Sequence, residues 1–278
     1  MYQLDLGTNI HLFLPDGPNK DYRKQLKEIK NEGFKSVEVS IGKAGGYKVS
    51  LERCIEEVGD GLQAVLDEGL ILNSIHMPFA RFNYISSYDD EVRLFVLDEF
   101  CKIIEICDKY NPNHYVIHSK TKAKDLAPYW DMRKAALIDS FSKMVATTKN
   151  NICMENMTGV GFPNNVADMV EILGEIEGVK CCIDMNHFLR DKAEDAIPAL
   201  GKWLRAIHVS DYDGVAEKHW LPKEGVNDWM KIIGALEKVG YQGAFTYEAY
   251  REKYGYTYAD IRKNYEELFE EYNKLASR

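Results

Sequence analysis

The chain has 278 residues, 45% hydrophobic and 28% charged, a size and balance that suit a globular protein with a sizeable core. Its formal net charge of −9 and pI of about 5.4 argue against a nucleic-acid partner, because phosphate binding is mainly electrostatic. The N-terminal segment lacks the pattern of a signal or transit peptide, and no apolar run reaches the length of a membrane span. We therefore expect a soluble, cytoplasmic protein. The six cysteines form no C-x-x-C pair, which favours buried, reduced thiols at Cys153, Cys181 and Cys182.

Short strand-like runs alternate with amphipathic helical segments along the whole chain. The expected strands cover residues 3–6, 36–41, 71–75, 114–117, 151–154, 179–183, 204–209 and 244–247. The expected helices cover residues 22–31, 51–68, 89–110, 131–149, 163–173, 196–201, 228–239 and 258–275. Eight such units without a change in composition predict a single-domain (β/α)8 TIM barrel over residues 1–278. A doubly wound open sheet is the alternative, but the G-x-G-x-x-G that would follow its first strand is absent.

Residues that can bind metals or transfer protons lie at the ends of six expected strands. In a TIM barrel these ends meet at one rim, where catalytic residues gather. The six residues are His76, His118, Glu155, Asp184, His208 and Glu248. Further residues of these types follow two of the strands, namely His187, Asp211, Asp213, Glu217 and His219. His114 begins its strand and is expected to be structural, and His11 has no evident partner.

Four of these residues come from adjacent strands, so their side chains can meet around one point: Glu155, Asp184, His208 and Glu248. Two carboxylates about 5 Å apart repel by roughly 3 kcal/mol at an effective dielectric constant near 20. A divalent cation removes this penalty, and three carboxylates with one imidazole suit Mn²⁺, Mg²⁺, Co²⁺ or Zn²⁺. The alternative is that each acid pairs with a nearby lysine or arginine. The other candidates for a further metal or for substrate binding are His76, His118, His187, Glu217 and His219.

Aromatic residues and lysines also follow the strand ends. The aromatic residues could stack on a sugar or a base, or could only cap the barrel or form a subunit contact. They are Phe79, Phe82, Tyr84, Tyr129, Trp130, Trp220, Tyr250, Tyr254 and Tyr256. Lys120, Lys122 and Lys124 could meet a phosphate, but a solvated surface is the preferred interpretation.

The sequence resembles the xylose isomerase-like TIM barrel superfamily over nearly its whole length. The resemblance rests on HMPF at His76, ENM at Glu155, CIDMNH at Asp184 to His187, HVSDYDG at His208, KHWLPKEGVNDW and YEAY at Glu248. It implies that Glu155, Asp184, His208 and Glu248 bind one metal ion. It further implies that Glu155 and Glu248 form an acid–base pair and that His187 contacts a substrate oxygen.

The same superfamily contains endonuclease IV (AP endonuclease family 2), which uses three zinc ions. That resemblance implies one zinc at His76, His118 and Glu155, a second at the four-residue site, and a third at His187, Glu217 and His219. Three departures count against it: the nuclease D-T-C-H reads D-M-N-H at Asp184, Glu217 replaces an aspartate in a shorter loop, and HMPFARFN replaces a HAPY-type strand end.

The sequence therefore predicts a divalent-metal-dependent isomerase or epimerase of a ketose or related sugar or sugar phosphate. Proton transfer by the two glutamates would pass through a metal-stabilised enediolate. A zinc-dependent AP endonuclease is the main alternative; a related dehydratase and a barrel that binds a sugar without turnover are further ones. The sequence does not distinguish between candidate sugars or metals, and both a monomer and a homo-oligomer are compatible with it.

Overall fold

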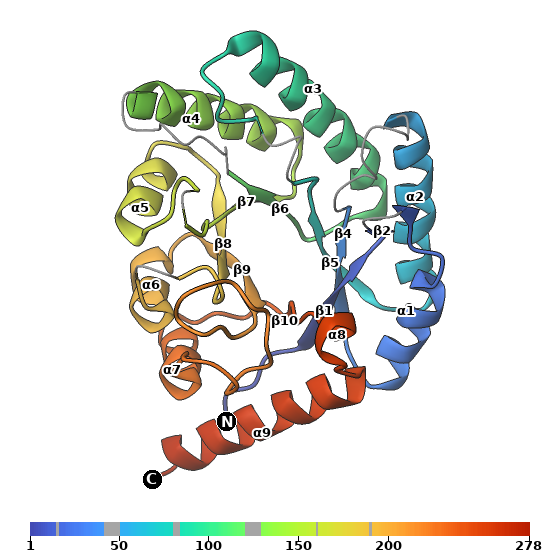
Figure 1. The fold of residues 1–278 in the computed structure, drawn as a ribbon, viewed down its shortest axis with the longest axis vertical. Helices are drawn as coiled ribbons and strands as arrows, with labels where there is room; N and C mark the ends of the chain where they lie inside the picture. The colour runs from blue at the N-terminus through green and yellow to red at the C-terminus, as the bar shows by residue number, and fades with distance from the viewer. Residues whose placement is uncertain (15–16, 42–50, 80–83, 120–128, 160, 189–190) are drawn as a thin grey trace.

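Eight parallel strands close into a barrel that surrounds one axis (Figure 1). The computed structural model describes residues 1–14, 17–41, 51–79, 84–119, 129–159, 161–188 and 191–278, with the backbone alone for residues 51–54. The strands follow the order β1-β10-β9-β8-β7-β6-β5-β4, and β4 returns to pair with β1. They are β1 (Leu6–His11), β4 (Ser36–Ser40), β5 (Ile71–His76), β6 (His114–His118), β7 (Asn151–Glu155), β8 (Lys180–Asp184), β9 (Leu204–Val209) and β10 (Phe245–Tyr247). The predicted (β/α)8 barrel is confirmed.

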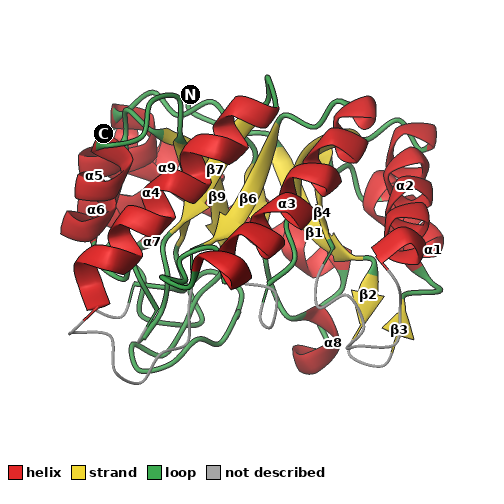
Figure 2. Cartoon of the chain, turned by 90° about the horizontal axis from the view of Figure 1, so that it is seen from above, coloured by secondary structure: helices red, strands yellow, loops and turns green. Residues whose placement is uncertain are grey.

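Helices form a ring outside the strands, as the views in Figures 1 and 2 show. They are α1 (Tyr22–Asn31), α2 (Leu51–Asp67), α3 (Asp90–Cys107), α4 (Trp130–Thr147), α5 (Val166–Gly174), α6 (Ala193–Leu200), α7 (Trp229–Lys238) and α9 (Tyr258–Ala276). Their bounds lie within three residues of the predicted ones. The last three residues of the helix predicted over 89–110 form a separate 3-10 helix, Asp108–Tyr110. None of the described helices combines the length and the apolar character that a membrane crossing needs.

The first strand lies further along the chain than predicted. The predicted strand covers residues 3–6, whereas β1 begins at Leu6 and ends at His11, so His11 belongs to the strand. Its pairing with β4 and β10, over Gly7 to His11 and Leu6 to Thr8 respectively, fixes the strand despite its polar residues. Residues 3–6 alternate more clearly between apolar and polar, but pairing with the two neighbouring strands determines where the strand lies. The short hairpin of β2 (Phe13–Leu14) and β3 (Gly17–Pro18), and helix α8 (Arg251–Tyr254), were not predicted.

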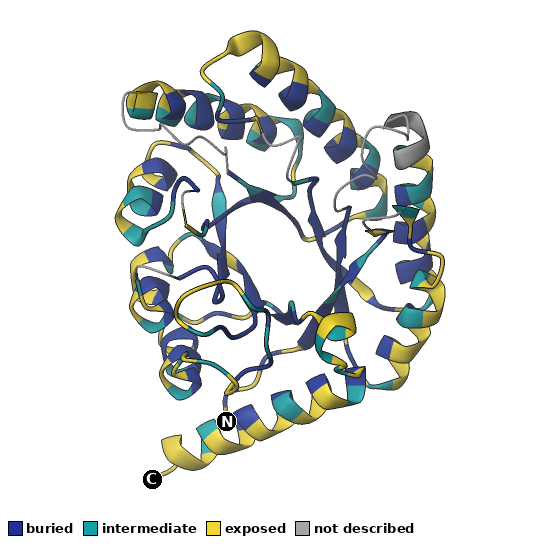
Figure 3. Ribbon diagram, in the orientation of Figure 1, coloured by how far each residue is buried: buried dark blue, intermediate teal, exposed yellow. Residues whose placement is uncertain are grey.

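Side chains alternate between the inside of the barrel and the helical ring. Outward-facing Ile117, Met154, Ile183 and Ile207 are fully buried against the helices and belong to the main hydrophobic core. A small inner cluster, Val116, Cys153, Cys182 and Ala206, lies two residues before the strand-end residues and so shares their face. The strands are buried on both faces (Figure 3), as expected for a parallel barrel. Cys153, Cys181 and Cys182 are buried and free, which confirms their predicted state.

Some sequence-based expectations fall outside the described residues. Phe82 and the lysines Lys120, Lys122 and Lys124 belong to this group.

Candidate active site

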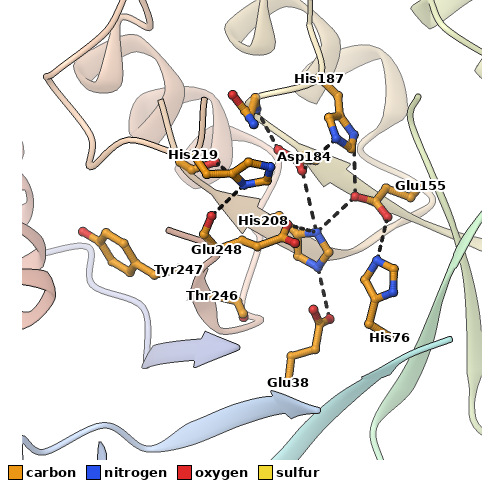
Figure 4. A network of polar contacts seen from close by, with 12 residues as sticks. Glu38, His76, Glu155, Asp184, His187, His208, His219, Thr246, Tyr247 and Glu248 are labelled. Atoms are coloured by element: carbon orange, nitrogen blue, oxygen red, sulfur yellow. Dashed lines mark hydrogen bonds and ion pairs between the residues drawn. The ribbon is translucent and has the colours of Figure 1, made fainter. Parts of the chain in front are cut away.

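The four residues predicted to share one point do come together at the C-terminal ends of their strands. Each offers a ligand-type atom, and these atoms all lie within 4.8 Å of one another. His208 Nδ1 is at the centre, 2.9 Å from Glu248 Oε2, 3.1 Å from Glu155 Oε1 and 3.9 Å from Asp184 Oδ2. In Figure 4 the carboxylates of Glu155 and Glu248 approach this nitrogen from the two sides. The side chain of Glu248 is 14% exposed and that of Glu155 only 1%, so Glu248 is the more accessible from the rim.

Histidines, not lysine or arginine, accompany these carboxylates. Within the described part of the chain, Glu155, Asp184 and Glu248 form ion pairs only with imidazoles. The alternative in which each acid pairs with a basic surface residue is therefore wrong for the described residues. A cluster of carboxylates and imidazoles is the donor set of a transition-metal or magnesium-type site.

A second group forms around Glu155 on the other side. His118 Nε2 lies 2.9 Å and His76 Nε2 3.3 Å from Glu155 Oε2, and the two nitrogens are 3.1 Å apart. His76 Nδ1 lies 3.0 Å from the carbonyl oxygen of Met77. Because a carbonyl only accepts, this ring nitrogen carries the proton and Nε2 is left to face Glu155. The aromatic ring of Phe79 covers both imidazoles, with its centroid 5.3 Å from each.

His187, Glu217 and His219 meet above Asp184. Glu217 Oε1 is 2.9 Å from His219 Nε2 and 3.7 Å from His187 Nε2, which in turn is 3.4 Å from Asp184 Oδ2. Both histidines donate from Nδ1 to a backbone carbonyl, His187 to Asn156 and His219 to Glu248, each at 2.8 Å. His219 also has a positive φ of 59° and stacks on Tyr250 at 4.0 Å. A non-glycine residue in this conformation is uncommon and is held by its surroundings.

Two acidic residues at the start of the same loop do not join the cluster. Asp211 is fully buried and accepts hydrogen bonds from three backbone N–H groups of its own loop and from the indole N–H of Trp229 at the start of α7. Asp213 pairs with Lys218 at 3.0 Å near the surface. His114, for which we expected a structural role, begins β6 at the opposite end of the barrel and is buried.

Burial and mutual charge shift the pKa values of the site residues strongly. Burial alone would raise the pKa of Glu155, but His118 and His208 lower it well below its usual value. Burial raises the pKa of Asp184 to about 7, with the charges of Glu248 and Glu155 adding to the effect. Burial opposes protonation of His208, yet Cys182 and the surrounding carboxylates raise its pKa well above the usual value. Without a cation, His208 therefore stays protonated and its positive charge offsets the negative charge of the carboxylates. A divalent cation can supply this positive charge instead.

The residues present fit a divalent cation. Oδ2 of Asp184 is buried and has no hydrogen-bond partner, although Oδ1 of the same carboxylate accepts from the backbone N–H of Asn186 at 2.7 Å. A buried carboxylate oxygen without a hydrogen bond is costly. This oxygen lies 3.9 Å from His208 Nδ1, the nitrogen on which the other ligand-type atoms converge. The side-chain amide of Asn156 holds the same strand end: its Nδ2 donates to the C=O of Asp184, and its Oδ1 accepts from the N–H of Asp184.

One buried carboxylate in this centre was not predicted. Glu38 lies in the middle of β4, is 1% exposed, and places Oε2 3.1 Å from Nε2 of His208 (Figure 4). Glu38 lies two residues before the end of β4, so the rule that catalytic residues gather at strand ends does not predict it. A glutamate within a strand expected to be buried on both faces is the signal that could have found it.

The fold and site define a class: TIM barrels that gather carboxylates and histidines at the C-terminal ends of their strands. A family model for xylose isomerase-like TIM barrels matches residues 20–275, so the chain belongs to that family. A search of curated protein sequences found no match.

Solved structures share the fold across nearly the whole chain. The 3-keto-D-glucoside 4-epimerase from E. coli is 20% identical with a TM-score of 0.71, covering 96% of this chain and 99% of that one. An L-ribulose 3-epimerase is 14% identical with a TM-score of 0.76, covering 99% and 97%. A D-tagatose 3-epimerase-like protein is 16% identical with a TM-score of 0.76, covering 98% and 100%.

Proposed function

We propose that the protein is a divalent-metal-dependent isomerase or epimerase of a ketose or a related sugar or sugar phosphate. The observation that carries the proposal is the position of Glu155 and Glu248, which approach His208 Nδ1 to 3.1 and 2.9 Å. Epimerisation or isomerisation beside a carbonyl needs one group that removes a proton and another that returns one. Two carboxylates beside one candidate metal site can supply both groups. The solved structures of similar fold include proteins named as sugar epimerases, which supports this choice of chemistry.

Glu155, Asp184, His208 and Glu248 would hold the cation. When bound, a divalent cation polarises a carbonyl oxygen and stabilises the negative charge that forms on it after proton loss. Asn156 and the backbone N–H of Asn186 hold Asp184 in place, so this ligand needs no reorganisation.

Glu155 and Glu248 would move the protons. One carboxylate removes the proton from the carbon beside the carbonyl, and the other returns a proton to the opposite face or to the neighbouring carbon. Two groups are needed because one side chain does not easily reach both faces of a substrate. His187 presents Nε2 to the same space, since its Nδ1–H is bonded to the carbonyl of Asn156, and would bind a substrate oxygen.

Glutamine substitutions test the acid–base pair. We expect Glu155→Gln and Glu248→Gln, each loaded with metal, to lose interconversion by roughly 10²–10⁴. Each variant should still exchange one epimer's carbon-bound proton with deuterium from the solvent, because one base remains. Exchange is measured by NMR on candidate ketoses, after elemental analysis has confirmed the metal content.

Glu177→Gln is the matched control, because Glu177 is exposed and lies outside the site. Interconversion at the wild-type rate by either metal-loaded site variant would refute the acid–base pair. The absence of carbon–proton exchange with every ketose or keto sugar, on the intact protein, would refute the proposed function.

A zinc-dependent endonuclease at abasic sites is the second candidate. The close group of His76, His118 and Glu155, and the group of His187, Glu217 and His219, correspond to the two further zinc sites that this alternative needs. Counting metal ions in the purified protein separates the candidates: one ion per chain favours the epimerase or isomerase, and three zinc ions favour the nuclease. Zinc-dependent nicking of an abasic duplex that is lost on His219→Ala would reverse our preference.

A further inference from the structure

Glu38 is a buried carboxylate inside the barrel, directly beneath the site. Its side chain is 1% exposed, and it occupies the middle of β4 between the outward-facing Val37 and Val39. A carboxylate in this position is costly unless strong hydrogen bonds compensate for the loss of water. The partners of Glu38 therefore indicate what it does.

Two described groups contact Glu38, and both use the same oxygen. The hydroxyl of Ser74 donates to Oε2 at 2.7 Å, and His208 Nε2 lies 3.1 Å from it. No described lysine or arginine pairs with this carboxylate, and its Oε1 has no hydrogen-bond partner. Thus the imidazole of His208 is the group that compensates most of its charge.

Four histidines of the site divide into two types by the acceptor that each ring uses. His76, His187 and His219 place Nδ1 on a backbone carbonyl and direct Nε2 into the cluster. His208 is reversed: its Nδ1 faces the three carboxylates, and its Nε2 faces the side chain of Glu38.

This reversal requires a proton on Nε2. A neutral imidazole has one N–H and one lone pair, and an ionised carboxylate can only accept. Glu38 therefore favours a proton on Nε2 in both the charged and the neutral imidazole. In the neutral form the lone pair is then on Nδ1, where a cation would be bound. Cys182 is the other nearby group, within 4.8 Å in a set with Glu155 and His208, but a thiol is only a weak acceptor.

We propose that Glu38 is a positioning residue for the metal centre: its carboxylate holds His208 in the orientation and tautomer that present Nδ1 as a ligand. The proposal rests on the metal centre of the proposed function, but it is independent of the reaction and the sugar. Partners of metal-binding histidines commonly fix the tautomer and strengthen the ligand in this way.

The test is Zn²⁺ affinity, measured by competition with a chromophoric chelator in the full-length protein. We expect Glu38→Gln to raise the Kd about tenfold, because an amide can accept or donate and so no longer fixes the tautomer. Glu38→Met, which removes both hydrogen bonding and charge, should raise the Kd by up to about 100-fold. Ser74→Ala, which removes only the support of Oε2, should have a smaller effect. The visible spectrum of bound Co²⁺ should change in the Glu38 variants, because the His208 ligand is altered.

Val116→Ala is the control for a purely structural effect. Val116 is fully buried in the inner cluster below the site, so this variant should lower thermal stability and leave the Kd and the Co²⁺ spectrum unchanged. Wild-type binding with an unchanged Kd and spectrum in both Glu38 variants would overturn this proposal and leave the proposed function intact. Failure of the wild-type protein to bind Zn²⁺, Mn²⁺ or Co²⁺ would overturn both.

Discussion

Asp211 lies at the start of the loop after β9 and accepts three hydrogen bonds from that loop and one from the first residue of α7. Oδ1 accepts from the backbone N–H groups of Tyr212 and Asn227, and Oδ2 from the N–H of Lys223 and from Trp229 Nε1, at 2.8–3.2 Å. The loop comes so close that a side chain at Gly225 would overlap Asp211 Oδ1 and the carbonyl of Tyr212. This single carboxylate therefore fixes the path of the segment that carries Glu217 and His219.

We expect Asp211→Asn to destabilise the protein by about 3 kcal/mol or more, because an amide group would face donors that need an acceptor. The free energy of unfolding from urea titration measures the effect. Asp213→Asn is the matched control: Asp213 pairs with Lys218 near the surface, and we expect no measurable change there. Equal stability of the two variants would show that Asp211 does not organise the loop.

Most residues of the candidate site could be predicted from the sequence, because a parallel barrel brings the C-terminal ends of its strands together. The rule found six residues that lie at the last position of their strand or one position from it: His76, His118, Glu155, Asp184, His208 and Glu248. The same rule could not separate Asp211 from a ligand, since the hydrogen bonds that occupy it come from residues up to 18 positions later. It also missed Glu38, because nothing local shows that a mid-strand glutamate faces a histidine 170 residues away.

Among the elements, those with strong local signals were predicted best. Helix α1 was predicted with its observed bounds, and α9 begins at the predicted Tyr258. By contrast, α8 has only four residues, ends at Gly255 with φ 76°, and is stabilised from outside by Arg251 over the ring of Tyr258 at 3.5 Å. Such a short helix has almost no intrinsic stability, so its sequence gives little sign of it.

The start of α9 carries a reciprocal cap. Thr257 Oγ1 accepts from the N–H of Asp260 at 3.1 Å, and Asp260 Oδ2 accepts from the N–H of Thr257 at 2.8 Å. We expect Thr257→Ala to lower the free energy of unfolding by about 1 kcal/mol, and Thr257→Ser to lower it by much less. Urea denaturation of both variants measures the difference, and an alanine variant as stable as the serine variant would contradict the capping role.

For the whole molecule, the crowded carboxylates couple metal binding to stability. Glu38, Glu155, Asp184 and Glu248 all lie within hydrogen-bonding or ion-pair distance of one imidazole. A ligand that binds only the folded state at a hundred times its Kd stabilises that state by about 2.7 kcal/mol. Removal of the cation should therefore lower the melting temperature by several degrees, and restoring it should recover the loss.

Calorimetry before and after chelation, with the metal content verified, measures this shift. Asp184→Asn serves as the comparison, since removal of one ligand should reduce the response to added metal. An unchanged melting temperature after complete metal removal would show that the carboxylates do not depend on a cation.

The barrel joins the two ends of the chain, and this has a consequence for its synthesis. β1 pairs with β10, and residue 2 exchanges backbone hydrogen bonds of 2.9 Å with the side chain of Asn273. At about 5–20 residues per second, the first strand leaves the ribosome roughly 10–50 s before its last neighbour. Throughout that interval the nascent sheet has open edges able to pair with other chains. The edge of β1 that faces β10 therefore stays open to other chains until residues Phe245–Tyr247 have been translated.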